Sequence, residues 1–148
     1  DIMEEYVEDI DVNVLQNPGF RAGVRTSIAL GLKSVPNFCA GAVLIPADMP
    51  NITPEHINKM IDVFQKEDGK CLVVSAYDGS KQNPVLWSKE LFDYADIVPE
   101  NAAIRPVFME HADYTHTVSV KNAAEIFDIN FPSDIESLLR KPEGKKSK

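Results

Sequence analysis

The sequence predicts a three-layer α/β/α domain in which a mostly parallel mixed sheet lies between two layers of helices. Strand-like and helical segments alternate along the chain, and two strand candidates, residues 41–45 and 71–75, are continuous apolar runs. Such runs are typical of strands buried on both faces, as in α/β sheets. Ligands of these sheets bind beyond the carboxyl ends of the strands. We therefore expect the functional site near residues 46–50 and near Asp128.

The first elements are read from short local patterns. Residues 12–15 look like a short strand that ends in the Asn-Pro-Gly turn at residues 17–19. Residues 24–33 combine spaced apolar side chains with Ala and Gly, which predicts a tightly packed helix. The apolar run 41–45 is expected to be a central strand, and Pro46 stops it.

The clearest element is a helix that begins after Thr53. Thr53 can cap it, Pro54 suits the first helical position and Glu55 suits the first turn. Its apolar residues recur at helical spacing: Ile57, Met60, Ile61 and Phe64. His56 is expected at an exposed position of this helix.

The second half of the chain continues the alternation. The expected elements are a strand at 71–75, a turn at 78–79, a helix at 88–94, a helix around 101–109, a strand at 115–120, a strand from 126–127 and a helix at 132–139. No repeat or linker divides them. We predict one domain over residues 1–140, followed by a polar basic tail at 141–148.

Composition and charge limit the kinds of partner and the cellular location that we expect. The chain has 148 residues and a net charge of −8, so nucleic acid is a poor partner. An acidic protein can still bind a nucleotide through a divalent cation. No apolar stretch has the length of a membrane span and no secretory signal opens the chain, so we expect a cytoplasmic protein. Cys39 and Cys71 are expected to be buried free thiols.

Acidic and amide side chains follow two predicted strands. Asp48 comes directly after the run 41–45 and either ligates Mg²⁺ or caps the next turn; position alone favours neither. In a strand, Asp128 and Asn130 would share one face and offer two oxygens together. The same pattern before Pro132 is also typical of a turn that starts a helix.

A loop that leads into a helix offers a third candidate. Gly23 lets the backbone approach a ligand, and Thr26 and Ser27 place hydroxyl groups near the start of the helix. Ordinary capping of the helix explains the same residues.

Four segments in order resemble the MobA-like nucleotidyltransferases, in particular the molybdenum cofactor cytidylyltransferase branch. They are NPGFRAGVRTSIALGL, AVLIPADMPNITPEHINKMI, YDGSKQNPVLWSKELF and FDINFPSDIESL. The resemblance covers about residues 11–140 and implies a nucleotide-diphospho-sugar transferase-like fold. It implies transfer of CMP from CTP, with GTP as the less favoured nucleotide, to the terminal phosphate of molybdopterin, without a covalent enzyme intermediate.

The resemblance also implies roles for seven residues. Asp48 and Asn130 match the Mg²⁺ ligands, Gly23, Thr26 and Ser27 match the nucleotide contacts, and Asn83 and Arg105 match the substrate side. The family signature Leu-Ala-Ala-Gly-x-Ser-x-Arg-Met-Gly-x-x-Lys, which wraps the triphosphate, is not in this sequence. We therefore expect an N-terminally incomplete fold.

Three alternatives follow from that expectation. The chain is part of an active enzyme, or it is a truncated, inactive relative that binds a nucleotide or a partner, or it self-associates or pairs with a separate N-terminal chain. A sugar-phosphate nucleotidyltransferase of the same fold is the competing enzymatic interpretation.

Overall fold

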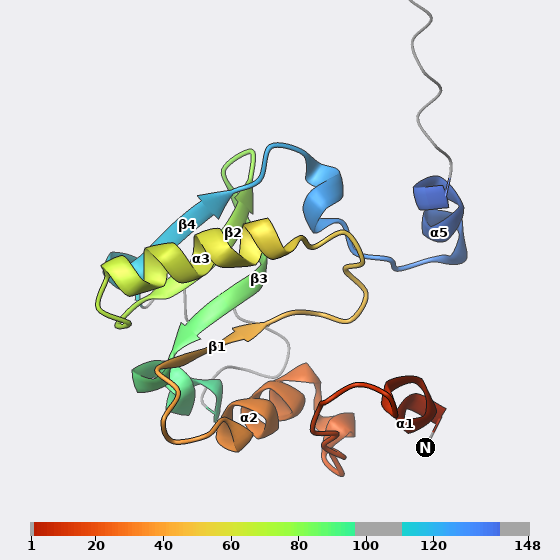
Figure 1. The fold of residues 1–148 in the computed structure, drawn as a ribbon, viewed down its shortest axis with the longest axis horizontal. Helices are drawn as coiled ribbons and strands as arrows, with labels where there is room; N and C mark the ends of the chain where they lie inside the picture. The colour runs from red at the N-terminus through yellow and green to blue at the C-terminus, as the bar shows by residue number, and fades with distance from the viewer. Residues whose placement is uncertain (1, 97–110, 140–148) are drawn as a thin grey trace, which may run out of the picture.

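The computed structural model describes residues 2–96 and 111–139, and its centre is a four-stranded sheet with the order β1-β3-β2-β4 (Figure 1). The strands are β1 (Gly41–Leu44), β2 (Leu72–Tyr77), β3 (Ser80–Ser88) and β4 (Thr115–Ser119). β3 is antiparallel to both β1 and β2, whereas β2 and β4 are parallel. Three of the four described strands therefore run in one direction, which confirms the predicted mostly parallel mixed sheet.

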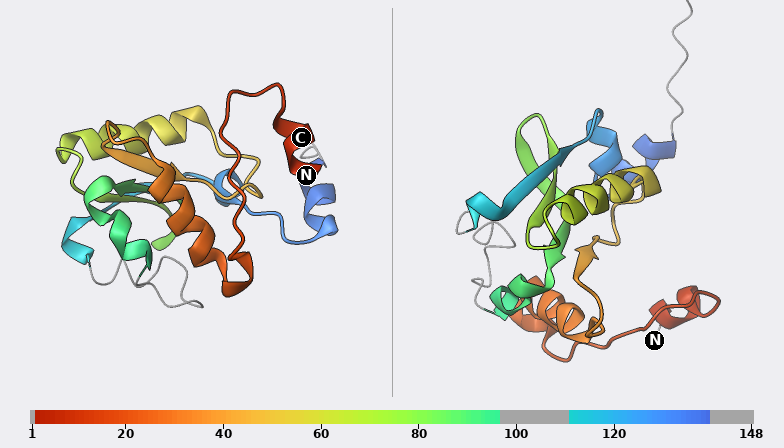
Figure 2. Two further views of the ribbon diagram at one scale, coloured as in Figure 1. Left: turned by 90° about the horizontal axis from the view of Figure 1, so that it is seen from below. Right: turned by 60° about the vertical axis from the view of Figure 1, so that its left-hand side comes forward.

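Helices cover both faces of the sheet. α3 (Pro54–Lys66) lies on one face, and α2 (Val24–Ser34) with the 3₁₀ segment η2 (Lys89–Asp96) lies on the other (Figure 2). Successive residues of β2 and β3 alternate between two cores, as the pleat requires. The α2 side contains Ala29, Leu32, Leu72, Val74, Val85, Trp87 and Ala95, and the α3 side contains Met60, Phe64, Cys71, Val73, Leu86 and Val118. The α/β fold class and its three layers are confirmed.

The start of α3 confirms the local prediction except at one residue. The Thr53 hydroxyl accepts a hydrogen bond from the His56 amide at 3.2 Å, and Pro54 begins the helix. Lys59 pairs with Glu55 one turn earlier. The prediction that His56 is exposed is wrong, because the first turn of α3 packs on β2 and the imidazole is 4% exposed. Its Nε2 lies 2.7 Å from the Ser75 hydroxyl.

Two strand predictions before α3 need correction. Residues 12–15 form no strand, and their side chains are exposed. They follow α1 (Ile2–Val7), which lies apart from the sheet in every view (Figures 1 and 2). The run 41–45 gives β1, but β1 is at an edge of the described sheet and is only half-buried.

In the C-terminal half, β3 is an additional strand between the turn expected at 78–79 and the helix expected at 88–94. The Pro84 in this segment argues against a regular strand, and β3 includes it through a shift in register: Val74 pairs with Val85, but Ser75 pairs with Gln82. The Asn83–Pro84 peptide bond is cis.

The prediction of a last strand that begins at residues 126–127 is also wrong. Residues 123–126 form the 3₁₀ segment η4 (Ala123–Ile126), and an irregular stretch leads to α5 (Pro132–Leu139), which is confirmed. Two further short 3₁₀ segments are η1 (Phe20–Ala22) and η3 (Ala112–Tyr114). The helix expected around 101–109 lies outside the described residues. Within the described ranges, no helix has the length and apolar character needed to cross a membrane.

Candidate functional site

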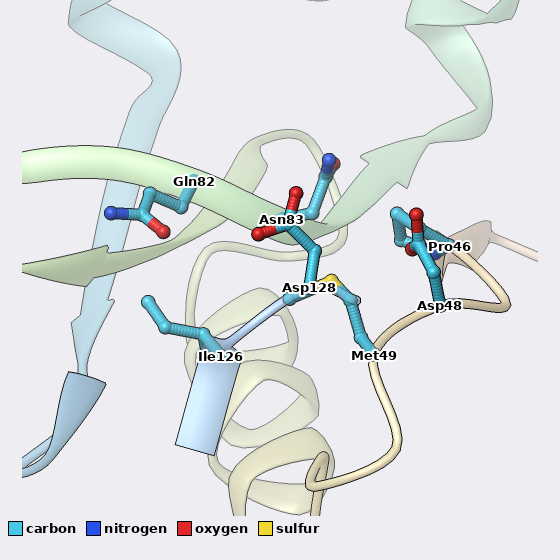
Figure 3. A pocket seen from close by; sticks show the side chains of 7 residues that line it. All are labelled: Pro46, Asp48, Met49, Gln82, Asn83, Ile126 and Asp128. Carbon is cyan, nitrogen blue, oxygen red and sulfur yellow. The ribbon is translucent and has the colours of Figure 1, made fainter. Parts of the chain in front are cut away.

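A polar pocket of about 290 Å³ lies beyond the carboxyl end of β1, where the crevice was predicted (Figure 3). We call it the acidic pocket. Its lining residues are Pro46, Asp48, Met49, Gln82, Asn83, Ile126 and Asp128. The first three follow β1, the next two belong to β3, and the last two come from the stretch around η4. The pocket therefore joins segments that are far apart in the sequence.

Main-chain and amide hydrogen bonds hold the two acidic segments together. The Ile129 amide donates to the carbonyl oxygen of Asp48 at 2.8 Å, and the Asn51 side chain donates to the carbonyl oxygen of Ala124 at 2.9 Å. A small apolar cluster consists of Met49, Val120 and Ile126, with Ile52 packed against it. Two members of this cluster, Met49 and Ile126, also line the pocket, so the acidic side chains lie next to a packed apolar cluster.

The donor atoms of the pocket suit a hard cation. In Figure 3 the carboxylates of Asp48 and Asp128 extend towards the same side of the pocket, where Asn83 also lies. Both aspartates are exposed, and Gln82 and Asn83 add amide oxygens. Mg²⁺ prefers such oxygens, and it is usually bound by one or two carboxylates together with substrate phosphates and water. Within the described residues, no group of three or more His, Cys, Asp or Glu side chains is arranged to bind a metal ion.

The two members of the Asp128/Asn130 pair lie in different surroundings. Asp128 lines the acidic pocket, but Asn130 does not. The amides of Asn130 and Phe131 instead donate to the Asp134 carboxylate at 2.9 and 2.8 Å, at the start of α5. The strand alternation that grouped Asp128 with Asn130 does not apply, because residues 127–130 are irregular.

The predicted nucleotide loop is organised by Asn17. Its side-chain nitrogen donates to the hydroxyl oxygens of Thr26 at 2.8 Å and Ser27 at 2.9 Å, and its oxygen accepts from the Gly19 amide at 2.9 Å. The Thr26 hydroxyl donates to the Gly23 carbonyl at 2.9 Å. Gly23 precedes α2 with a φ of 98°, a conformation that favours glycine. Thr26 and Ser27 therefore do not cap the helix; Asn17 holds them.

This loop borders a second hollow of about 350 Å³, separate from the acidic pocket. Its lining residues are Asn17, Pro18, Arg25, Thr26, Ala29, Leu30, Lys33 and Asp96. Lys33 forms an ion pair of 2.7 Å with Asp96, and the Arg25 guanidinium donates to the Asp96 carbonyl. Of the three predicted nucleotide residues, only Thr26 lines this hollow.

The structure thus places Asp48 and Asn83 in one pocket with Asp128, and Thr26 in another. Arg105 lies outside the described residues. Strand alternation made Asp128 a candidate together with Asn130, but the resemblance assigned the metal role to Asn130, and Gln82 was not assigned to the site. Asp128 is detectable as an acid at the end of an apolar segment, but the position of Gln82 depends on the register shift in β3, for which the sequence has no local signal.

A three-layer α/β fold with an oxygen-rich pocket at the carboxyl end of a strand defines a domain suited to binding phosphorylated ligands through a cation. The chain belongs to the family described as MobA-like NTP transferase domain, whose sequence model matches residues 2–115. No curated protein matches the chain.

Solved structures share the fold at low sequence identity. The manganese complex of Rv0371c from Mycobacterium tuberculosis H37Rv is 19% identical to this chain with a TM-score of 0.64. The match covers 76% of this chain and 59% of the Rv0371c chain. Its homologue from Mycobacterium sp. strain JC1 is 20% identical with a TM-score of 0.63, covering 76% and 55%. The 4-diphosphocytidyl-2C-methyl-D-erythritol synthase from Anaerococcus prevotii DSM 20548 is 15% identical with a TM-score of 0.71, covering 93% and 71%. The chain spans less than two thirds of the length of the two mycobacterial proteins.

Proposed function

We propose that the whole protein transfers CMP from CTP to the terminal phosphate of molybdopterin in molybdenum cofactor biosynthesis. The observation that carries the proposal is the acidic pocket, in which Asp48, Asp128 and Asn83 lie together at the carboxyl end of β1. Family membership supports nucleotidyl transfer in general. The cytidylyl and molybdopterin assignments rest on the four motif segments of the sequence.

In the proposed reaction, an oxygen of the acceptor phosphate attacks the α-phosphorus of CTP. The bond from that phosphorus to the bridging oxygen breaks, and pyrophosphate leaves with the electron pair. A bound Mg²⁺ would neutralise charge on the phosphates. The chain would contribute positioning: Asp48 and Asp128 hold the metal ion, and the Asn83 amide lies on the acceptor side.

The metal assignment differs in one residue from the one that the motifs suggest. Asp128 supplies a charged oxygen inside the pocket lining, whereas Asn130 is outside it and offers a neutral oxygen. Asp128 is therefore our second ligand. Gly23 and the hydroxyls of Thr26 and Ser27, fixed by Asn17, are the proposed nucleotide contacts.

A second candidate is cytidylyl transfer to a phosphorylated sugar or polyol. The Anaerococcus synthase supports it, because the product in its name joins cytidine through a diphosphate to a methylerythritol. Both candidates share the nucleotide and differ in the acceptor. Pyrophosphate release by the whole protein from CTP, with molybdopterin or with phosphorylated methylerythritol as acceptor, separates them.

The metal site is tested by calorimetry of CTP binding to the 148-residue chain with and without Mg²⁺. We expect Mg²⁺-dependent binding that Asp48→Asn and Asp128→Asn each abolish. Asp62→Asn, which changes an exposed carboxylate on α3, and Asn130→Ala should leave the affinity unchanged. Unchanged magnesium dependence in Asp48→Asn would overturn the assignment. Binding without turnover by the whole protein would instead favour the inactive relative.

A further inference from the structure

A buried chain of polar groups connects α3, β2 and β3. The Nε2 atom of His56 lies 2.7 Å from the Ser75 hydroxyl oxygen, and that hydroxyl donates to the Pro84 carbonyl oxygen at 2.9 Å. All three residues are buried. A buried hydroxyl and a buried carbonyl need partners. The hydrogen bonds of the Ser75 hydroxyl therefore link α3, β2 and β3, in addition to the hydrogen bonds of the sheet ladder.

The chain of polar groups lies where the β2–β3 ladder is interrupted. Val74 pairs with Val85, but the next residue, Ser75, pairs with Gln82. Asn83 and Pro84 are thus two extra residues on β3, a bulge without ladder partners on β2. The Ser75 side chain supplies the hydrogen bond to Pro84 that the ladder does not. Bulges re-aim side chains and are common next to functional sites.

The direction of these hydrogen bonds defines the tautomer of His56. A serine hydroxyl has one hydrogen. Because the Pro84 carbonyl can only accept whereas Nε2 can donate, all three groups are satisfied when Ser75 donates to Pro84 and accepts from the Nε2–H of His56. The Met60 sulfur, 3.7 Å from the same hydroxyl, is a weaker acceptor. Burial lowers the pKa of His56, which favours the neutral ring with a single N–H. The imidazole therefore orients the Ser75 hydroxyl.

The bulge held in this way forms one wall of the acidic pocket. Gln82 and Asn83, which directly precede Pro84, line the pocket together with Asp48 and Asp128 (Figure 3). We propose that Ser75, oriented by His56, is a positioning residue of this pocket: by fixing the Pro84 carbonyl it holds the Asn83 amide beside Asp48 and Asp128. The choice of Mg²⁺ and CTP as the ligands of this pocket rests on the proposed function.

A double-mutant cycle on the 148-residue chain tests the route through Asn83. Ser75→Ala should weaken Mg²⁺-dependent CTP binding about three- to tenfold, the worth of one hydrogen bond. Asn83→Ala should weaken it similarly. If Ser75 acts through Asn83, the double variant Ser75→Ala/Asn83→Ala binds no more weakly than Asn83→Ala alone. Additive losses would overturn the proposal.

Two further variants separate positioning from stability. Ser88 is a second buried serine, at the other end of β3, and its hydroxyl donates to the Gly69 carbonyl at 2.8 Å. Ser88→Ala should lower the free energy of unfolding without changing the affinity. His56→Gln keeps a nitrogen donor near Ser75 and should retain the affinity that His56→Ala loses. His56→Ala also replaces Ser75→Ala in the test if the latter does not fold.

A ligand-free measurement distinguishes failure of this inference from failure of the proposed function. Absence of Mg²⁺-dependent CTP binding to the whole protein would contradict the proposed function alone. In the ¹⁵N–¹H spectrum without ligand, Ser75→Ala should shift or broaden the side-chain amide signal of Asn83, and Ser88→Ala should not. An Asn83 signal that is unchanged by Ser75→Ala would overturn the positioning role whatever the ligand.

Discussion

The main-chain amide of Ile129 donates a hydrogen bond of 2.8 Å to the main-chain carbonyl oxygen of Asp48. This contact joins the turn after β1 to the irregular stretch after η4. Because the hydrogen bond holds Ile129 in place, it also restrains the preceding residue, Asp128. The carboxylates of Asp48 and Asp128 consequently line one pocket, although 80 positions separate them in the sequence. The first prediction tests this connection.

Replacing Ile129 by proline removes the donating N–H. We expect Ile129→Pro to weaken Mg²⁺-dependent CTP binding, because Asp128 loses its connection to the turn that contains Asp48. Ile129→Ala retains the N–H and serves as the matched control. Calorimetry measures the affinity of both variants for CTP in the presence of Mg²⁺, and a weaker affinity of Ile129→Pro supports the prediction. Equal affinities would show that the main-chain contact does not order the pocket.

The pH dependence of stability should report the buried His56. Its pKa in the folded state is lowered chiefly by burial, with Lys59 acting in the same direction and Glu125 opposing it. The unfolded state therefore binds more protons as the pH falls through the ordinary value of 6.5, so the free energy of unfolding decreases there. In His56→Gln this contribution disappears. Urea unfolding from neutral to mildly acidic pH should show a smaller decrease for the variant than for the wild type.

The loop before α2 should depend on Asn17. Asn17→Ala removes three hydrogen bonds, to Thr26, Ser27 and the Gly19 amide, and should lower the free energy of unfolding by about 1–3 kcal/mol. It should also weaken CTP binding if these hydroxyls contact the nucleotide. Asn13→Ala changes an exposed residue of the preceding segment and is the control. Denaturant titration and calorimetry of both variants separate the two effects; an unaltered midpoint for Asn17→Ala would refute the structural role.

Two glycines should respond in opposite ways to alanine. A Cβ atom at Gly41 would lie 2.4 Å from the Trp87 carbonyl oxygen and 2.8 Å from the Phe64 ring, so Gly41→Ala should cost about 3 kcal/mol or more. A Cβ at Gly31 in α2 would meet nothing within 4 Å, and Gly31→Ala should stabilise the helix by about 0.5–1 kcal/mol. Thermal unfolding of both variants provides the comparison. A Gly41→Ala midpoint at or above that of the wild type would contradict the packing of β1 on β3.

The two free cysteines should differ in reactivity. Cys71 is 2% exposed, and burial raises the pKa of its thiol to about 11. Cys39 is half-buried in the loop before β1. Since the thiolate is the reactive form, iodoacetamide at neutral pH should modify Cys39 first in the folded protein, and both cysteines in denaturant. Peptide mass mapping identifies the modified site; early modification of Cys71 would contradict the buried position of β2.

Much of the fold was predictable because its signals are local. The Thr53 cap, the Pro54 start and the apolar spacing of α3 depend on residues within one or two helical turns, and the structure confirms them. The same applies to the buried run that becomes β2 and to α5. The sequence by itself also determined that the pocket would follow β1, since the ends of strands are visible in an apolar pattern.

Only the tertiary structure decided how distant segments meet. The bulge that aims Asn83, the burial of His56 against Ser75 and the choice of Asp128 over Asn130 each depend on contacts between elements that are separate in the chain. The alternation argument failed at residues 127–130 because it assumes a paired strand, and this stretch pairs with none of the described strands. Local patterns determine which elements form; packing between elements determines which side chains share a site.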